Sequence, residues 1–149
     1  MSYSLEGTKV WVAGHRGMVG GAVARRLESE GCELLLAGRD AVDLCDQSAV
    51  QAWMSDNRPD CVVVAAAKVG GIKANNEKRA EIIFNNLAIQ NNVIDSSFKN
   101  GVKNLIFLGS SCVYPRNSKI PIKENYLLSD YLEKTNEPYA IAKIAGINL

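Results

Sequence analysis

The first part of the chain alternates between a short apolar run and a stretch in which apolar residues recur at every fourth position. Residues 9–13 (Lys-Val-Trp-Val-Ala) are rich in β-branched and aromatic side chains and run into a glycine-rich segment, which predicts a strand that ends in a turn. Val19, Val23 and Leu27 then lie four residues apart, as on one face of a helix. Gly31 is the expected C-terminal cap of that helix.

The same alternation continues along the chain. The next expected elements are a strand at Glu33–Leu36, a candidate short strand at Val42–Leu44, and a helix from Gln47 that Pro59 stops. A strand at Asp60–Ala66 follows, and then a long helix with Ile83, Leu87, Ile94 and Phe98 on one stripe. The last expected elements are a strand at Lys103–Gly109, a loop over Pro115–Asp130, and a final helix that begins near Pro138. The run at 60–66 is apolar almost throughout, which is typical of a strand with both faces covered.

Strands that alternate with helices of this length predict an α/β domain, with a parallel sheet and helices on both faces. Because crossovers between parallel strands are right-handed, we expect a doubly wound sheet of the Rossmann type. No repeat or linker interrupts the pattern, and 149 residues suffice for one ordinary domain. We therefore expect residues 1–149 to belong to one domain.

The composition is that of a globular protein with balanced charges. Hydrophobic residues make up 47% and charged residues 22%, and 17 Lys and Arg against 16 Asp and Glu give a formal charge of +1. That balance supplies no basic surface for nucleic acid or for an anionic membrane, so we expect neither as a partner. A phosphate-bearing ligand would have to be held by local geometry.

The sequence also favours a cytoplasmic location. The longest apolar run, Cys61–Ala67, is too short to cross a bilayer, and the stretch Met1–Gly7 lacks the basic and apolar regions of a secretion signal. The cysteines show no paired spacing. We therefore expect free thiols, and we interpret Cys32, Cys45 and Cys61 as structural.

Three glycines follow the first expected strand, in the string AGHRGMVG at 13–20. In a dinucleotide-binding unit one glycine permits a tight turn, a second lets the backbone approach a pyrophosphate, and a third lets helix and strand pack closely. The N–H groups at the helix start then face the phosphates, with help from the helix dipole. Because these glycines lie between a first strand and a first helix, they predict such a site. Its expected residues are Gly14, His15, Arg16, Gly17, Met18, Val19 and Gly20.

The end of the second expected strand bears on which dinucleotide is bound. An acidic residue there suits the ribose 2′-OH of NAD, whereas an arginine suits the 2′-phosphate of NADP. The strand leads to Arg39, and Arg16 of the glycine turn could reach the same phosphate, so that two guanidiniums form a clamp. We therefore expect NADP(H). The alternative is that Arg39 is a solvated loop residue and Asp40 is the ribose acid.

Tyr139 and Lys143 lie four residues apart, which puts them on one face of the last expected helix. Thr135 or Asn136 can cap that helix, and Pro138 suits its first turn. A free tyrosine has a pKa of about 10 and is a poor acid or base at neutral pH. The lysine charge, together with the positive ring of an oxidised nicotinamide, is expected to lower the tyrosine pKa into working range.

The expected strand that precedes this helix ends at Gly109 and leads into Ser110, Ser111 and Cys112. Ligands of an open parallel sheet bind at such strand ends. A Tyr-x-x-x-Lys pair alone says little, because both residues are common on helix surfaces. Together with a serine-bearing strand end and a glycine turn in this order, it predicts a catalytic site.

These features together resemble the extended short-chain dehydrogenase/reductases. The strings AGHRGMVG (13–20), AAAKVGGI (65–72), LGSSCVYP (108–115) and NEPYAIAKIAGI (136–147) are similar to those of the branch that converts GDP-4-keto-6-deoxy-D-mannose to GDP-L-fucose. The resemblance implies an NADPH-dependent enzyme that epimerises C3 and C5 of this nucleotide sugar and reduces C4.

The resemblance also implies a role for each matching residue. Tyr139 would donate a proton to the C4 oxygen, and Lys143 would hold the nicotinamide ribose and lower the tyrosine pKa. Ser110 would bind the 4-keto oxygen, and Cys112 would be the base at C3 and C5. Beyond the glycine turn, the implied NADP contacts are Arg39, Asp40, Asp43, Leu44, Ala66, Leu108, Gly109, Ser110, Ser111 and Lys143.

Members of this family continue beyond the position of residue 149 with a further strand, a histidine acid that works with the cysteine, and a smaller domain for the GDP-sugar. His15, the single histidine, lies in the glycine turn and does not match that acid. The resemblance therefore implies that residues 1–149 are an N-terminal NADP-binding Rossmann domain, incomplete at its final strand or strands and without the substrate domain. The full-length parent is expected to be a homodimer.

Some alternatives stay open. Cys112 could be a buried filler instead of a base. Lys68 with the glycines at 70–71 could form an active-site loop or a simple turn, and Asn85 and Asn86 could bond inside the site or face solvent. Two other functions compete. One is a nucleotide-sugar 4-epimerase or dehydratase, which would favour NAD and lack the cysteine. The other is a non-catalytic or vestigial NADP-binding module.

Overall fold

The computed structural model describes residues 4–149. Residues 1–3, the start of the stretch that is expected to lack a secretion signal, lie outside the described residues. The chain divides into two compact units. The first runs to Ala67 and resumes over Ala88–Leu108, and the second comprises Lys68–Leu87 and Gly109–Leu149.

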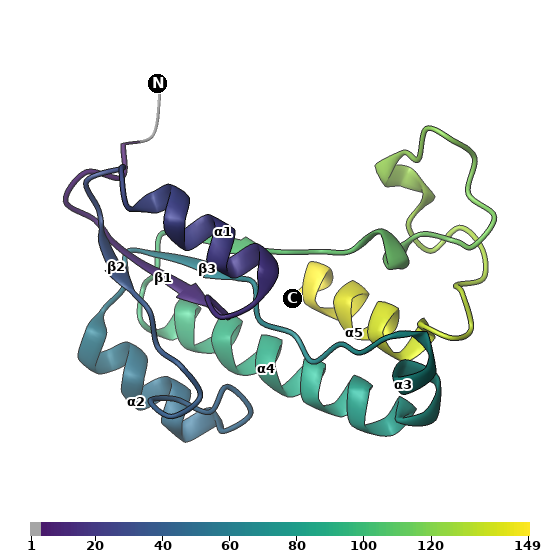
Figure 1. The fold of residues 1–149 in the computed structure, drawn as a ribbon, viewed down its shortest axis with the longest axis horizontal. Coiled ribbons are helices and arrows are strands. Elements are labelled where there is room, and N and C mark those ends of the chain that lie inside the picture. Colours follow the sequence, from purple (N-terminus) through teal and green to yellow (C-terminus); the bar gives the residue numbers. More distant parts are fainter. Residues whose placement is uncertain (1–3) are drawn as a thin grey trace. The chain divides into compact units, whose positions relative to one another are not determined.

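The first unit is built on a four-stranded parallel sheet (Figure 1). Its strands are β1 (Lys9–Ala13), β2 (Glu33–Leu35), β3 (Cys61–Val64) and β4 (Asn104–Phe107), in the order β2-β1-β3-β4. In the register, Val10 of β1 lies opposite Leu34 on one side and Cys61 on the other. The strand order therefore reverses direction between β1 and β3. Each strand falls within a sequence-predicted run, and all but β1 are shorter than predicted.

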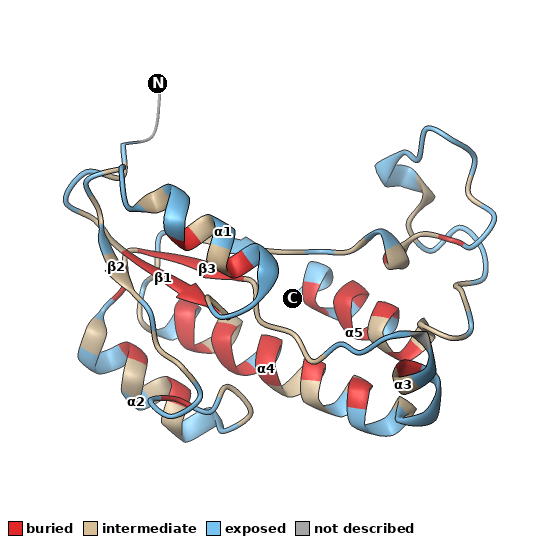
Figure 2. Cartoon of the chain, in the orientation of Figure 1, coloured by how far each residue is buried: buried red, intermediate tan, exposed pale blue. Residues whose placement is uncertain are grey.

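Successive residues of a strand point to opposite sides of the sheet, so both faces of this sheet carry apolar side chains. Helices cover both of these faces. One face packs against α2 (Gln47–Asn57) and α4 (Arg79–Lys99), and the other packs against α1 (Met18–Leu27). The buried members of the first cluster are Trp11, Ala13, Val42, Val50, Met54, Val62, Val64 and Val93. Those of the second are Val10, Cys61 and Val63, with Val23 and Leu27 of α1 packed against them. Figure 2 shows β1, β3 and the inner side of α4 as buried, which confirms the predicted doubly wound α/β class.

Local chemistry explains the limits of α2. At its start the Asp46 side chain accepts a hydrogen bond from the Ala49 N–H at 3.0 Å, a typical N-cap. At its end the Arg58 N–H donates to the Met54 carbonyl at 2.8 Å, with Arg58 in the left-handed region at φ 50°. Pro59 follows at once and cannot continue a helix. The predicted stop is confirmed.

Two local predictions were wrong. Residues 42–44 form no strand; they lie in a turn-rich segment, and Val42 reaches the core from it. Helix α1 ends at Leu27 with Glu28 as its C-cap, and Gly31 lies in the turn beyond at φ +68°. Its positive φ therefore belongs to this turn and not to the end of the helix.

The sequence predicts that the apolar stripe of Ile83, Leu87, Ile94 and Phe98 lies in the core, and this prediction was wrong. Phe98 is 85% exposed, whereas Ile82, Ile89 and Val93 are buried. The buried face includes polar residues as well, namely Asn86, Gln90, Asn92, Ser96 and Ser97. Because those side chains interrupt the apolar spacing, hydrophobic periodicity alone selected the neighbouring stripe.

The second unit contains α3 (Ile72–Glu77), the beginning of α4, two 3₁₀ turns at Ser111–Val113 and Glu124–Tyr126, and α5 (Glu137–Asn148). The predicted loop at 115–130 is irregular apart from the second of these turns. Pro138 lies in the first turn of α5, as predicted. Asn136 is at the N-cap position, but its side chain does not cap the helix. Across residues 4–149, none of the helices has the length and apolar character needed to cross a membrane.

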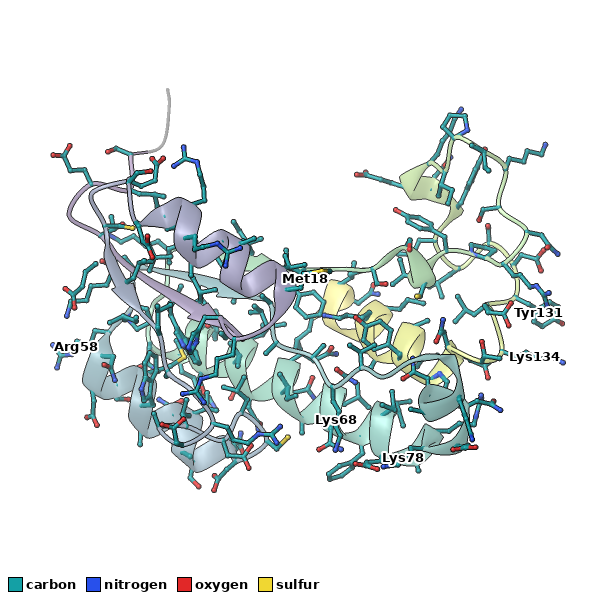
Figure 3. The ribbon with its side chains drawn as sticks, in the orientation of Figure 1. Met18, Arg58, Lys68, Lys78, Tyr131 and Lys134 are labelled. Atoms are coloured by element: carbon teal, nitrogen blue, oxygen red, sulfur yellow. The ribbon has the colours of Figure 1, made fainter. Side chains whose placement is uncertain are left out.

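Met54 and Met18 form a matched pair for testing the packing of the first unit. Met54 is fully buried in α2, whereas Met18, labelled in Figure 3, is 90% exposed in the first turn of α1. We expect Met54→Ala to lower the free energy of unfolding by about 2–5 kcal/mol, because a cavity remains. Met18→Ala should change it by less than about 0.5 kcal/mol. Urea unfolding measures both, and equal losses would contradict the packing described.

Candidate active site

The glycine turn after β1 is packed against backbone on two sides. Gly14 has a φ of +93°, and a Cβ there would lie 2.6 Å from the Ala66 nitrogen. A Cβ at Gly20 would lie 2.8 Å from the Gly14 carbonyl carbon. Gly17 is the N-cap of α1, and its N–H donates to the Gly14 carbonyl at 2.9 Å. The geometry at Gly14 is therefore that of a tight turn, and at Gly20 that of close packing between the turn and the helix.

A cavity of about 270 Å³ opens beside this turn. Segments that follow β1, β2 and β3 line it, where the order of the sheet reverses and where open α/β sheets bind ligands. The lining residues are Gly14, His15, Arg16, Gly17, Ala37, Gly38, Arg39, Val42, Asp43, Leu44, Cys45, Ala65, Ala66, Ala67 and Ile89. The N–H groups at the start of any helix lack partners within it, so the start of α1 offers donors for an anion.

Arg16 and Arg39 both line this cavity, as an arginine clamp requires. Arg16 Nη2 lies 3.0 Å from Asp40 Oδ1, and both side chains are at least two-thirds exposed. A Cβ at Gly38 would lie 2.5 Å from the Arg16 guanidinium carbon, so the guanidinium rests on bare backbone. Because the Asp40 carboxylate is engaged with Arg16, the geometry favours Asp40 as a counter-ion over Asp40 as a ribose ligand.

His15 adds a polar side chain to the lining of the cavity. Its Nδ1 atom is buried and has no hydrogen-bond partner among the described residues. Buried polar atoms are rarely left without a partner. The glycine turn leaves no room for a Cβ and leads into the start of α1, which suits a pyrophosphate. The two arginines suit a phosphate, and the unpaired ring nitrogen of His15 adds a further polar group. Together these residues fit a dinucleotide.

Several predicted cofactor residues do not line the cavity. Met18 and Val19 are exposed in the first turn of α1, and Gly20 is buried beneath it. Leu108 follows β4 in the first unit, while Gly109, Ser110, Ser111 and Lys143 belong to the second. Conversely, Ala37, Cys45 and Ile89 line the cavity but were not predicted. They are apolar or small residues that only the fold brings to the cavity.

The second unit gathers the residues predicted to be catalytic. Ser110 is the N-cap of the 3₁₀ turn at Ser111–Val113, and its Oγ accepts a hydrogen bond from the Cys112 N–H at 3.3 Å. The Ser110 side chain is also hydrogen-bonded to the Tyr139 phenol, whose charge is coupled to that of Cys112. Lys143 Nζ lies 5.9 Å from the centre of the Tyr139 ring. The predicted set is therefore brought together in one unit.

The environment of this cluster shifts two pKa values. Burial raises the pKa of Tyr139 above its ordinary value, the Cys112 charge raises it further, and the Ser110 hydrogen bond opposes both. In the chain by itself desolvation dominates, and the lowering of this pKa by an oxidised nicotinamide stays a prediction. Burial lowers the pKa of Lys143 to about 8 from its ordinary 10.5, and its side chain is only 3% exposed.

The loop at 68–71 is held by a buried amide. The Asn86 Oδ1 accepts from the Lys68 N–H at 2.9 Å, and the Asn86 Nδ2 donates to the Lys68 carbonyl at 2.7 Å. Asn86 therefore does not face solvent; Asn85 instead donates to the Glu81 carbonyl at 2.7 Å. The Lys68 ammonium, labelled in Figure 3, pairs with Glu81 and lowers the pKa of that carboxyl.

The remaining cysteines and acids form no further centre. Within the described residues, Cys32, Cys45, Cys61 and Cys112 form no disulfide. Within residues 4–149, no group of His, Cys, Asp and Glu is arranged to hold a metal ion.

A doubly wound parallel sheet with a glycine turn at its point of reversal defines the class of dinucleotide-binding α/β proteins. The chain belongs to the NAD dependent epimerase/dehydratase family, whose model matches residues 10–149.

Within this family, the chain is most usefully compared with individual proteins of known name. The chain is 52% identical to the GDP-L-fucose synthase of Sinorhizobium fredii over 99% of its own length and 47% of that protein. It is 53% identical to the GDP-L-fucose synthase of Escherichia coli, over 95% and 44%. MlghC, a GDP-mannoheptose C4 reductase from Campylobacter jejuni solved with NADP bound, superposes with a TM-score of 0.91 at 40% identity, over 97% and 46%. The chain spans about half the length of the curated relatives it matches.

The buried ammonium of Lys143 predicts a pH-dependent cost to folding. Because its pKa is about 8 in the folded chain and 10.5 when exposed, the unfolded chain binds more protons between these values, and stability rises with pH there. The cost is full below pH 8 and is lost as the pH approaches 10.5. We therefore expect Lys143→Met to raise the free energy of unfolding most below pH 8, with the gain shrinking as the pH rises.

Urea unfolding at a series of pH values measures this difference. Lys134→Met, at an exposed lysine, is the matched control and should show no such trend. A gain from Lys143→Met that stays constant with pH would show that the ammonium is not desolvated.

Proposed function

We propose that this chain carries the cofactor site and the proton-transfer residues of a GDP-L-fucose synthase. The reaction is 3,5-epimerisation of GDP-4-keto-6-deoxy-D-mannose followed by NADPH-dependent reduction at C4. The observation that carries the proposal is the cluster of Ser110, Cys112, Tyr139 and Lys143 in one unit. The likeness to relatives named GDP-L-fucose synthase supports the choice of substrate.

NADP(H) is the cofactor that the first unit fits, and when bound it supplies the hydride. The glycine turn from Gly14 to Gly20 would hold the pyrophosphate, and Arg16 and Arg39 would hold the 2′-phosphate. Asp43, Leu44 and Ala66 would line the adenosine side. NADP in the structure of MlghC is consistent with this preference.

Tyr139 is proposed as the proton donor in the reduction. A raised pKa keeps its phenol protonated at neutral pH, which suits a donor of a proton to the developing C4 alkoxide. The hydrogen bond to Ser110 orients the phenol, and Ser110 would also bind the 4-keto oxygen. The Lys143 ammonium beside the ring stabilises the phenolate that remains after proton transfer, and it would bind the nicotinamide ribose.

Cys112 is proposed as the base in the epimerisation. The C4 ketone makes the protons at C3 and C5 acidic, because the carbanion left by their removal is delocalised onto the ketone oxygen. Ser110 and Tyr139 would bind that oxygen, while the half-buried thiolate of Cys112 takes the proton from carbon. His15 lies in the glycine turn of the first unit, so the acid that returns a proton to carbon is assigned to no residue of this chain.

The competing functions make different use of the same residues. A nucleotide-sugar 4-epimerase or dehydratase would favour NAD, which Arg16 and Arg39 oppose, and would not need Cys112. A C4 reductase of the MlghC kind would use Tyr139 without epimerisation. A vestigial module would bind NADPH and do neither.

A cytoplasmic homodimer is the proposed form of the parent enzyme. Phe84 and Phe98 of α4 are 72% and 85% exposed, and exposed aromatic side chains of this size support an apolar interface.

Solvent exchange tests the proposed chemistry. The intact parent protein is incubated with GDP-4-keto-6-deoxy-D-mannose in D₂O, deuterium at C3 and C5 is followed by NMR, and NADPH is then added. We expect Cys112→Ser to slow exchange by about 10²-fold or more, the usual contribution of a general base. Tyr139→Phe should abolish NADPH oxidation. Cys32→Ser, at a structural thiol, is the control and should behave as wild type.

Normal exchange in Cys112→Ser would remove Cys112 from its role. Reduction without exchange in the unaltered parent protein would select the C4 reductase. Firm NADPH binding with neither exchange nor reduction would select the non-catalytic module.

A further inference from the structure

A buried amide in the second unit joins the loop at 68–71 to the start of α5. Asn75 of α3 is 3% exposed. Its Oδ1 accepts a hydrogen bond from the Gly70 N–H at 3.0 Å, and its Nδ2 donates to Asn136 Oδ1 at 2.9 Å. Asn136 is the N-cap of α5, three residues before Tyr139. One side chain therefore connects the loop with the helix that carries the proposed proton donor.

The partners fix the orientation of both amides. A backbone N–H can only donate, so Asn75 must present its oxygen to Gly70 and its NH₂ group to Asn136. Asn136 must in turn present its oxygen. Because the Asn136 side chain forms no capping bond to α5, its role is this contact and not the start of the helix.

The loop is held tightly at both of its ends. A Cβ at Gly70 would lie 2.8 Å from the Ala74 Cβ, so the loop packs directly on α3. Asn86, also 3% exposed, bonds both backbone groups of Lys68 and donates to the Ile82 carbonyl at 2.8 Å. Buried polar groups whose partners are all in place specify one arrangement, since any shift leaves a donor or acceptor unpaired.

Arg79 adds a second hold on the start of α5. Its Nη1 donates to the Lys134 carbonyl at 2.6 Å, and its Nη2 donates to Glu137 Oε2 at 2.6 Å. The side chains of this ion pair are 43% and 39% exposed, so it adds little stability. Because the planar guanidinium binds both the Lys134 carbonyl and the Glu137 carboxylate, it nevertheless fixes the direction in which the chain enters α5.

We propose that Asn75 and Arg79 are positioning residues, which set the start of α5 so that the Tyr139 phenol lies against Ser110. Asn75 also couples this placement to the loop at 68–71. The inference rests on the proposed catalytic role of Tyr139. Their contacts converge on residues 134–137, one helical turn before the phenol, where a small shift is carried directly to the proton donor.

The surroundings of the phenol can be measured without turnover. In the chain labelled with ¹³Cζ-tyrosine, the Tyr139 resonance is the one lost in Tyr139→Phe. Its titration midpoint reports the local environment, because burial and Cys112 raise the pKa and Ser110 opposes them. We expect Asn136→Ala to move the midpoint down, towards the ordinary value of about 10, because a loosened helix start admits water to the phenol.

Further variants separate positioning from general damage. Asn75→Ala should shift the midpoint in the same direction, and the double variant should go no further than the larger single shift, since both break one link. Asn136→Asp keeps an acceptor for the Asn75 NH₂ group, and its added negative charge disfavours the phenolate, so its midpoint should not fall below that of wild type. Asn76→Ala, at the exposed neighbour on α3, should also leave the midpoint unchanged.

A folded Asn136→Ala chain, judged by circular dichroism, whose Tyr139 titrates as in wild type would overturn the proposal. So would an Asn136→Asp chain that behaves like Asn136→Ala. The readout is independent of the exchange assay: a shifted midpoint in a chain that catalyses no exchange would refute the proposed function and support the link.

Discussion

The space where a Gly14 side chain would lie is filled by the backbone after β3. At this point the end of β1, the start of α1 and the end of β3 approach so closely that no Cβ fits between them. The left-handed conformation at φ +93° completes the turn that this approach requires. With the chain turned so tightly, α1 begins only a few residues after the end of β1, and the first N–H groups of a helix have no partner within that helix.

The rest of the first unit follows from that junction. Because β1 lies between β2 and β3, segments after all three strands open into the same cavity. The cavity is bounded by backbone and small side chains near the turn and by two arginines further out. Such a site binds phosphate through directed backbone N–H groups and a few positive side chains. A chain with a net charge near zero can therefore bind an anionic cofactor.

Much of the fold could be predicted from the sequence, because β-branched runs, helical spacing and glycine positions are local signals. The strands, α2 with its Pro59 stop, and the glycine turn are examples. The α4 stripe was mispredicted because its buried face includes Asn86, Gln90 and Ser97, which periodicity counts as polar. Cavity residues such as Ala37 and Ile89 carry no chemical signal of their own and become neighbours only through the sheet order.

The candidate catalytic set was accessible in part. Tyr139 and Lys143 are reactive types at a recognisable spacing and Ser110 follows a strand end, whereas the role of Cys112 was implied only by the family resemblance. Their electrostatics were not accessible. The direction of the Tyr139 pKa shift depends on how far the phenol is buried, which no spacing reveals. The hydrogen bond from Asn75 to Asn136 joins residues 61 positions apart, so it too can be recognised only in the folded chain.

Paired titration of the chain with NADPH and with NADH, followed by cofactor fluorescence, tests most directly whether the junction at Gly14 builds an NADP site. We expect NADPH to saturate the chain at clearly lower concentration than NADH, because Arg16 and Arg39 can bind the 2′-phosphate. A preference for NADH, or the absence of binding by either, would contradict that assignment.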